Sequence, residues 1–206
     1  MQFKLEKAPR KSIEKKKEKI LSTEEVFGAE ENDIEEFERY LEDLQLSKED
    51  LSKKILDVGG GSAQFAKWAK ENNVNSNIFS LDPVANMQER TKGVQGQAEA
   101  IPFQDNSFDL VVSDCAIPNV FLEEKDVKEK VRASLFEMVR VTKPGGEIRL
   151  GRVLRGDTYQ SQRDLTSVIN KTLKELKKIP GIEIEEHYSS VKTNMAKVNL
   201  IKIRKL

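Results

Sequence analysis

Apolar and polar residues in the middle of the chain follow an order that predicts strands alternating with helices. An apolar run at 55–58 leads into three consecutive glycines, and an amphipathic helical pattern follows them. Residues 77–81, NIFSL, form a second apolar run after an interval of one strand-helix-strand unit. This order predicts an α/β fold with a parallel sheet and helices packed on its faces.

The first fifty residues have a helical pattern of their own. Apolar residues recur at three- and four-residue steps and predict an amphipathic helix over 33–45, with an acidic outer face. Its apolar positions are Ile34, Phe37, Tyr40, Leu41 and Leu44. A short basic helix is expected over 12–21, and Ser47 with Asp50 has the spacing of a capping box.

The last fifty residues predict one more helix and two strands. Apolar residues at helical spacing indicate a helix over 158–178, which Pro180 and Gly181 end. Residues 182–188 and 198–203 then alternate with the period of a strand. Because no helix separates them, these two strands cannot be joined by a parallel crossover and are expected to form an antiparallel hairpin.

The glycine loop and two acids indicate a nucleoside-binding site. Backbone amides at Gly59, Gly60 and Gly61 can approach a ligand that a β-carbon would hold away. Asp57 lies at the carboxyl end of the first strand, where open α/β sheets bind ligands. Asp82 ends the second strand 25 positions later and is placed to accept both hydroxyls of a ribose.

The loop spacing argues against a dinucleotide. A pyrophosphate-binding loop has the pattern G-x-G-x-x-G, but the third glycine position is Gln64 in this chain. Nor does that pattern call for an acid two residues before the first glycine. Asp57 suits a ligand with a free amino group, and the helix amides after the loop suit its carboxylate. These are the charges of S-adenosylmethionine.

Over residues 54–153 the sequence resembles the class I S-adenosylmethionine-dependent methyltransferases of the methyltransferase type 11 kind. DVGGGSA resembles their first motif, with Ala63 in place of the last glycine. LDPVANM resembles the second motif. The resemblance implies that Asp82 binds the ribose and that Pro83 and Met87 lie near the adenine.

Two further segments extend the resemblance. GQAEAIPFQDNSFDLVVSDCA is similar to the stretch from the adenine-contacting loop into the fourth strand, and it implies cofactor contacts at Gln97, Ala98 and Ser113. Family members commonly have Asp where this chain has Gln97, whose amide oxygen is a weaker acceptor for the adenine amino group. VRVTKPGGEIRLGRV resembles the helix, Pro-Gly-Gly turn and fifth strand. The family fold is a Rossmann-like, doubly wound, seven-stranded sheet, mostly parallel, with an antiparallel C-terminal hairpin.

The segment 113–121, SDCAIPNVF, is expected to face the methyl acceptor, because it begins at the tip of the fourth strand. Asp114 is the candidate catalytic residue, able to orient or deprotonate an acceptor hydroxyl or amine. Asn119 is the candidate acceptor contact. The competing interpretations are structural: Asp114 would cap the following segment, and Asn119 would close a turn after Pro118.

Composition fits one enzyme domain with an appendage. We expect a helical extension at 1–50, which helps to cover the active site, and a catalytic domain at 51–206. The chain has 35 basic and 35 acidic residues, which argues against gross electrostatic capture of nucleic acid. It has a single Cys115, one histidine and no apolar stretch of membrane-spanning length. A cytoplasmic enzyme without a zinc site is therefore expected.

Three functions remain open. A short segment after the fourth strand favours a methyltransferase acting on a small molecule. The lysine-rich residues 3–19 would instead serve as a docking arm in an enzyme acting on RNA or protein. The departures at Ala63 and Gln97 also fit a catalytically silent S-adenosylmethionine-binding regulator. Membrane association is not expected, and the oligomeric state is left open.

Overall fold

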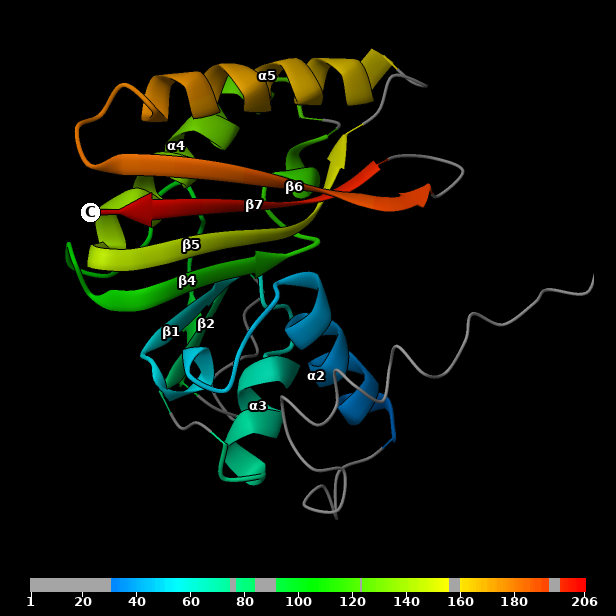
Figure 1. Ribbon diagram of the computed structural model, residues 1–206, viewed down its shortest axis with the longest axis vertical. Helices are drawn as coiled ribbons and strands as arrows, with labels where there is room; N and C mark the ends of the chain where they lie inside the picture. The colour runs from blue at the N-terminus through cyan, green and yellow to red at the C-terminus, as the bar shows by residue number, and fades with distance from the viewer. Residues whose placement is uncertain (1–30, 75–76, 84–91, 123, 156–159, 193–196) are drawn as a thin grey trace, which may run out of the picture.

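The computed structural model describes residues 31–74, 77–83, 92–122, 124–155, 160–192 and 197–206. A seven-stranded sheet forms its centre, in the order β3-β2-β1-β4-β5-β7-β6 (Figure 1). The strands are β1 (Ile55–Val58), β2 (Ile78–Asp82), β3 (Lys92–Gln95), β4 (Phe108–Asp114), β5 (Thr142–Arg155), β6 (Ile182–Lys192) and β7 (Lys197–Lys205).

The sheet is parallel from β3 to β5, and β7 is antiparallel to both of its neighbours, β5 and β6. The predicted C-terminal hairpin and the predicted mixed sheet are therefore confirmed. Strand β1 is buried at all four positions, as expected of a central parallel strand covered on both faces. The strand order reverses between β1 and β4, so a crevice is expected outside their carboxyl ends.

Helices cover both faces of the sheet (Figure 1). On one face, α4 (Val127–Val141) and α5 (Gln160–Leu176) enclose the larger hydrophobic cluster with alternate residues of β4, β5 and β7. On the other face, α2 (Glu31–Asp43) and α3 (Gln64–Glu71) enclose the second cluster. In that second cluster the rings of Phe37 and Trp68 stack with their centroids 3.7 Å apart.

The helices predicted at 33–45 and 158–178 are present with slightly shifted bounds. The predicted capping box is also present, at the 3₁₀ turn η2 (Asp50–Ser52). Asp50 Oδ2 accepts the Ser47 amide at 2.9 Å, and Ser47 Oγ accepts the Asp50 amide at 3.2 Å. The basic helix predicted at 12–21 lies outside the described residues.

Candidate functional site

The glycine loop lies between β1 and α3 and has two glycines with different functions. Gly59, at φ +77°, donates its N–H to the Leu81 carbonyl at 2.7 Å. A β-carbon on Gly59 would lie 2.4 Å from the β-carbon of Ala116, so the protein's own packing requires glycine there. Gly61, at φ +54°, would direct a β-carbon into open space. The loop therefore packs against the 114–117 turn on one side and is open at Gly61.

Asp82 joins this loop to the tip of β2. Its Oδ2 accepts the Gly61 amide at 3.0 Å, and the residue is 8% exposed. The loop and the acid that the sequence predicts to share a ligand therefore lie in direct contact. The Asp82 carboxylate thereby also holds the glycine loop in position.

Asp57 is fully buried beneath the loop. The Tyr40 hydroxyl, from α2, lies 3.4 Å from both carboxylate oxygens and donates toward them. A β-carbon on Gly60 would lie 2.4 Å from Asp57 Oδ2, so the second glycine lets the acid sit against the backbone of the loop. The hydrophobic pattern placed Tyr40 on the apolar face of α2 but gave no sign that its hydroxyl reaches Asp57.

The segment expected to face the adenine follows β3. The Gly96 amide donates to the Asp82 carbonyl at 3.1 Å, which places this segment beside the tip of β2. Gln97 and Pro83 are exposed, whereas Ala98 is buried. Met87 lies outside the described residues.

Two residues of α4 fix the backbone that continues from Gln97. Glu137 accepts the Ile101 amide at 2.9 Å. Arg140 donates to the carbonyl oxygens of Ile101 at 2.9 Å and Phe103 at 2.8 Å. The hydrogen bond from Arg140 lowers the pKa of Glu137, and burial opposes this only in part. The segment expected to face the adenine is thus attached to a helix of the core.

Ser113 is fully buried near the end of β4, and its hydroxyl accepts the Ile117 amide at 2.9 Å. This hydrogen bond closes the turn that brings Ala116 against Gly59. The side chain of Ser113 therefore shapes the wall of the glycine loop, and its hydroxyl bonds within the protein.

Asp114 ends β4 and forms an ion pair with Arg152 of β5. Arg152 donates from Nε to Oδ1 at 3.2 Å and from Nη2 to Oδ2 at 2.7 Å. The Asp114 side chain has no exposed surface, whereas that of Arg152 is 28% exposed. Although burial disfavours its charged form, the hydrogen bond to Asp114 raises the pKa of Arg152. As a proton acceptor, Asp114 would first have to leave this ion pair.

Helix α2 adds an acid and a base to this pair. Arg39 Nε lies 3.5 Å from Asp114 Oδ2, and Asp43 Oδ2 lies 3.0 Å from Arg152 Nε. Burial and the negative charge of Asp114 raise the pKa of Asp43, although Arg152 and Arg39 oppose the effect. We refer to Arg39, Asp43, Asp114 and Arg152 as the acid-arginine cluster.

Two further residues shape the acid-arginine cluster. Asn119 donates from Nδ2 to the Arg152 carbonyl at 2.8 Å. Arg152 has a φ of +48° and lies in an irregularity of the β5–β7 pairing. A β-carbon on Gly151 would lie 2.6 Å from Asp114 Oδ1 and 2.9 Å from Leu44 Cδ2, so glycine gives room for both the acid and the end of α2.

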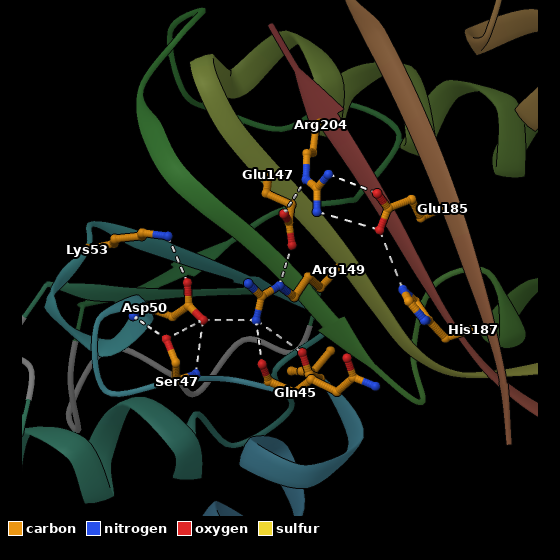
Figure 2. A network of polar contacts seen from close by, with 10 residues as sticks. Gln45, Ser47, Asp50, Lys53, Glu147, Arg149, Glu185, His187 and Arg204 are labelled. Atoms are coloured by element: carbon orange, nitrogen blue, oxygen red, sulfur yellow. Dashed lines mark hydrogen bonds and ion pairs between the residues drawn. The ribbon is translucent and has the colours of Figure 1, made fainter. Parts of the chain in front are cut away.

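A buried arginine fastens the chain after α2 to β5 (Figure 2). Arg149 Nη1 donates to the carbonyl oxygens of Leu44 at 3.2 Å and Gln45 at 2.7 Å, and lies 3.0 Å from Asp50 Oδ2. Ion pairs join Arg149 to Glu147, Glu147 to Arg204 and Arg204 to Glu185, and His187 Nε2 on β6 lies 3.6 Å from Glu185 Oε2. His187 thus belongs to this network in the closing hairpin.

Residues that the motifs did not indicate form much of this site. Tyr40, Arg39 and Arg152 come from α2 and β5, and only the folded chain brings them beside Asp57 and Asp114. One signal was available in the sequence: charged residues interrupt the apolar pattern of the fifth strand, EIRLGRV. A charge in a buried strand requires a partner.

Comparison with known proteins identifies the same part of the chain. A family model described as a methyltransferase domain matches residues 56–150. Over 111 residues the chain is 35% identical to the ubiquinone/menaquinone biosynthesis C-methyltransferase UbiE of Stenotrophomonas maltophilia, covering 47% of this chain and 41% of that protein. The chain therefore spans about two fifths of the length of this curated relative.

Solved structures share the fold at low sequence identity. NodS, an N-methyltransferase from Bradyrhizobium japonicum, matches with a TM-score of 0.58 and 18% identity, over 86% of this chain and 99% of that one. The [4+2]-cyclase SpnF matches with a TM-score of 0.54 and 17% identity, over 83% and 80%. At these identities the likeness shows the fold alone. Separately, no helix in the described part of the chain is long and apolar enough to cross a bilayer.

Proposed function

We propose that the chain is a class I S-adenosylmethionine-dependent methyltransferase that transfers the methyl group of S-adenosylmethionine to a small-molecule acceptor; the methyltransferase-domain match at residues 56–150 supports this. The observation that supports the proposal most directly is the contact between Asp82 and the open loop position Gly61. A buried carboxylate beside a backbone without side chains suits a ribose with an attached polar chain.

The residues at the strand tips fit this cofactor. Asp82 would bind the ribose hydroxyls, and Gly59, Gly60 and Gly61 would form the backbone surface against the amino-acid part. Gln97 is exposed at the adenine end, and its side-chain amide makes no hydrogen bond with the described residues. When bound, S-adenosylmethionine supplies an electrophilic methyl group on a positively charged sulfur.

The contribution of the protein would be mainly geometric. Methyl transfer requires nucleophile and methyl group in line, and holding them so in a site that excludes water gives much of the acceleration. Ser113 and Gly59 fix the turn between the cofactor loop and the acid-arginine cluster. Helix α2 covers this region through Tyr40 and Arg39. We propose that Asp114 acts in this site by orienting Arg152 and that Asn119 fixes the backbone of Arg152.

A small-molecule acceptor is the proposed substrate class because UbiE, as its name states, acts in ubiquinone and menaquinone biosynthesis. The lysine-rich segment on which an RNA or protein acceptor would depend lies outside the described residues. A second candidate function is cofactor binding without methyl transfer. The departures from the family motifs at Ala63 and Gln97 favour that candidate.

Calorimetric titration with S-adenosylmethionine and S-adenosylhomocysteine tests the proposal. Asp82→Ala should weaken both affinities at least tenfold, about 1.5–3 kcal/mol, because the ribose loses its charged acceptor. Asp82→Asn, which keeps an acceptor oxygen, is the matched control and should lose less. Affinities unchanged in Asp82→Ala would contradict the assignment. Incorporation of labelled methyl groups into metabolite fractions then separates an enzyme from a silent binding protein.

A further inference from the structure

The acid-arginine cluster lies where a methyl acceptor is expected, and its polar groups are unequally accessible. The side chains of Arg39 and Arg152 are 41% and 28% exposed, and that of Asp43 is 26% exposed. The Asp114 side chain has no exposed surface. An incoming molecule would therefore meet two guanidinium groups and the Asp43 carboxylate before any group of Asp114.

Arg152 is held by one edge only. Its Nε and Nη2 atoms bind Asp114, and Nε also faces Asp43. No hydrogen bond within the described part of the chain uses Nη1 of Arg152. A guanidinium has five N–H donors and can bind a second carboxylate through the edge that its first partner leaves.

The backbone around Arg152 fixes the position of this guanidinium. The residue has left-handed backbone dihedrals within β5, and its carbonyl accepts the Asn119 side chain at 2.8 Å. Gly151 gives room for the Asp114 carboxylate, and the Cys115 amide donates to the Gly151 carbonyl at 3.1 Å. An arginine held in this way loses little conformational entropy when it binds a ligand.

The acid-arginine cluster is also close to the glycine loop. Asp114 and Ala116 belong to the same short turn, and Ala116 is the residue against which Gly59 packs. Only β4 lies between β5, which has Arg152, and β1, which leads into the glycine loop. A molecule bound to Arg152 would therefore lie near the glycine loop, on the side where the methyl group is expected.

We propose that Arg152, with Arg39 beside it, is the acceptor-recognition site and that the methyl acceptor has a carboxylate group. This inference rests on the proposed methyltransferase function, because that function makes this end of the sheet the acceptor side. Asp114 is a positioning residue for Arg152. The bidentate geometry of a guanidinium with a carboxylate selects a planar anion over a neutral amide of the same shape.

The test compares carboxylates with their own amides. Wild-type protein is titrated with benzoate and benzamide, and with phenylacetate and phenylacetamide, both with and without saturating S-adenosylhomocysteine. Each carboxylate should bind at least tenfold more tightly than its amide. Arg152→Gln should reduce this preference to less than twofold, while its affinity for S-adenosylhomocysteine stays within twofold of wild type.

Two other variants make the result specific. Arg132→Gln is the matched control, because Arg132 is an exposed arginine on α4 that binds Glu175 at 2.9 Å; the preference should persist in this variant. Arg39→Gln changes a more exposed residue and should weaken carboxylate binding at least threefold even if Arg152→Gln does not fold. Arg152→Lys keeps the charge without the planar fork and should give an intermediate preference.

The outcomes separate the two proposals. A wild-type protein that does not distinguish carboxylates from amides, or a preference that survives both Arg152→Gln and Arg39→Gln, overturns the acceptor-recognition site. Failure of wild type to bind S-adenosylhomocysteine, with the carboxylate preference intact, contradicts the methyltransferase proposal and leaves an anion site that depends on Arg152.

Discussion

At the scale of single residues, two positions of the glycine loop have glycine for different reasons. Gly59 is required by the protein, since its β-carbon would collide with Ala116 and its backbone is left-handed. At Gly61 the same left-handed backbone faces open space. The motif suggests a bulky substitution at Gly59 as a test of ligand binding. Such a substitution would impair folding before it could report on binding.

Alanine substitutions at these two positions should consequently have different effects. We expect Gly59→Ala to lower the free energy of unfolding by about 2–4 kcal/mol, combining left-handed strain with overpacking. Gly61→Ala should cost only the strain, about 1–2 kcal/mol, but should weaken cofactor binding. Urea unfolding and calorimetry measure the two quantities. Gly145→Ala is the matched control, because Gly145 is also left-handed with an open β-carbon position and lies near the start of β5, away from the glycine loop. Equal losses of stability at Gly59 and Gly61 would contradict this distinction.

At the scale of elements, the attachment of η2 to β5 depends on ionised Asp50. Burial alone would raise the pKa of Asp50, but Lys53, Ser47 and Arg149 together lower it to about 2 from an ordinary value of 3.8. A depressed folded-state pKa means that the carboxylate stabilises the fold above pH 3.8. That stabilisation is lost as the pH falls from 3.8 through 2.

The size of this effect follows from the shift. A fall in the pKa of Asp50 from 3.8 to about 2 corresponds to about 2 kcal/mol of unfolding free energy. Unfolding free energies of wild type should therefore fall between pH 5 and pH 2 by about 2 kcal/mol more than those of Asp50→Asn, which has no carboxylate at this position to titrate. Parallel pH profiles for the two proteins would show that Asp50 does not provide this linkage.

The elements differ in how far local sequence determined them. Strands β1 and β2, the glycine loop, α3, α5 and the closing hairpin follow from periodicity and turn residues that lie next to one another in the chain. By contrast, β3, KGVQ, has four residues and an exposed-to-intermediate burial pattern, so it has no period to detect. Its place at the edge of the sheet comes from pairing with β2.

The candidate site shows the same limit. The positions of Asp57, Gly61 and Asp82 follow from a strand-loop-helix-strand order, because parallel strands end at the same edge of the sheet. The pairing of Arg152 with Asp114 joins residues 38 positions apart, and Arg149 reaches back 104 positions to Gln45. Such contacts depend on the β4–β5 register and on the packing of α2, neither of which a local pattern contains.

At the scale of the whole molecule, α2 belongs to the second hydrophobic cluster. Its residues Phe37, Tyr40 and Leu41, and Leu44 directly after it, are at most 5% exposed and pack with α3 and one face of the sheet. A division of the chain at residue 50 would separate this helix from the domain that it covers. Truncations can locate the boundary of the folding unit.

A chain that begins at Glu31 should fold, because α2 and the whole sheet remain. A chain that begins at Ser47 loses α2 and the buried side chains of Phe37, Tyr40, Leu41, Leu44 and Leu46, each contributing about 1.5–3 kcal/mol. The sum is comparable with the entire stability of a domain. We expect that shorter chain to lack cooperative unfolding in urea and to show a proton NMR spectrum with poor chemical-shift dispersion. A cooperatively folded chain starting at Ser47 would instead support the boundary at residue 50.

The fastening of α2 also bears on the kinetics of ligand entry. Tyr40 contacts β1, Arg39 and Asp43 join the ends of β4 and β5, and Arg149 holds the carbonyl oxygens that follow the helix. A helix with three separate attachments should not swing outward with each turnover, because all three would have to break together. Association of the cofactor should then be a single bimolecular step, with a rate that rises linearly with concentration. The enzyme would spend its catalytic cycle in one conformation of this wall, and turnover would be limited by chemistry or product release instead of by opening of α2.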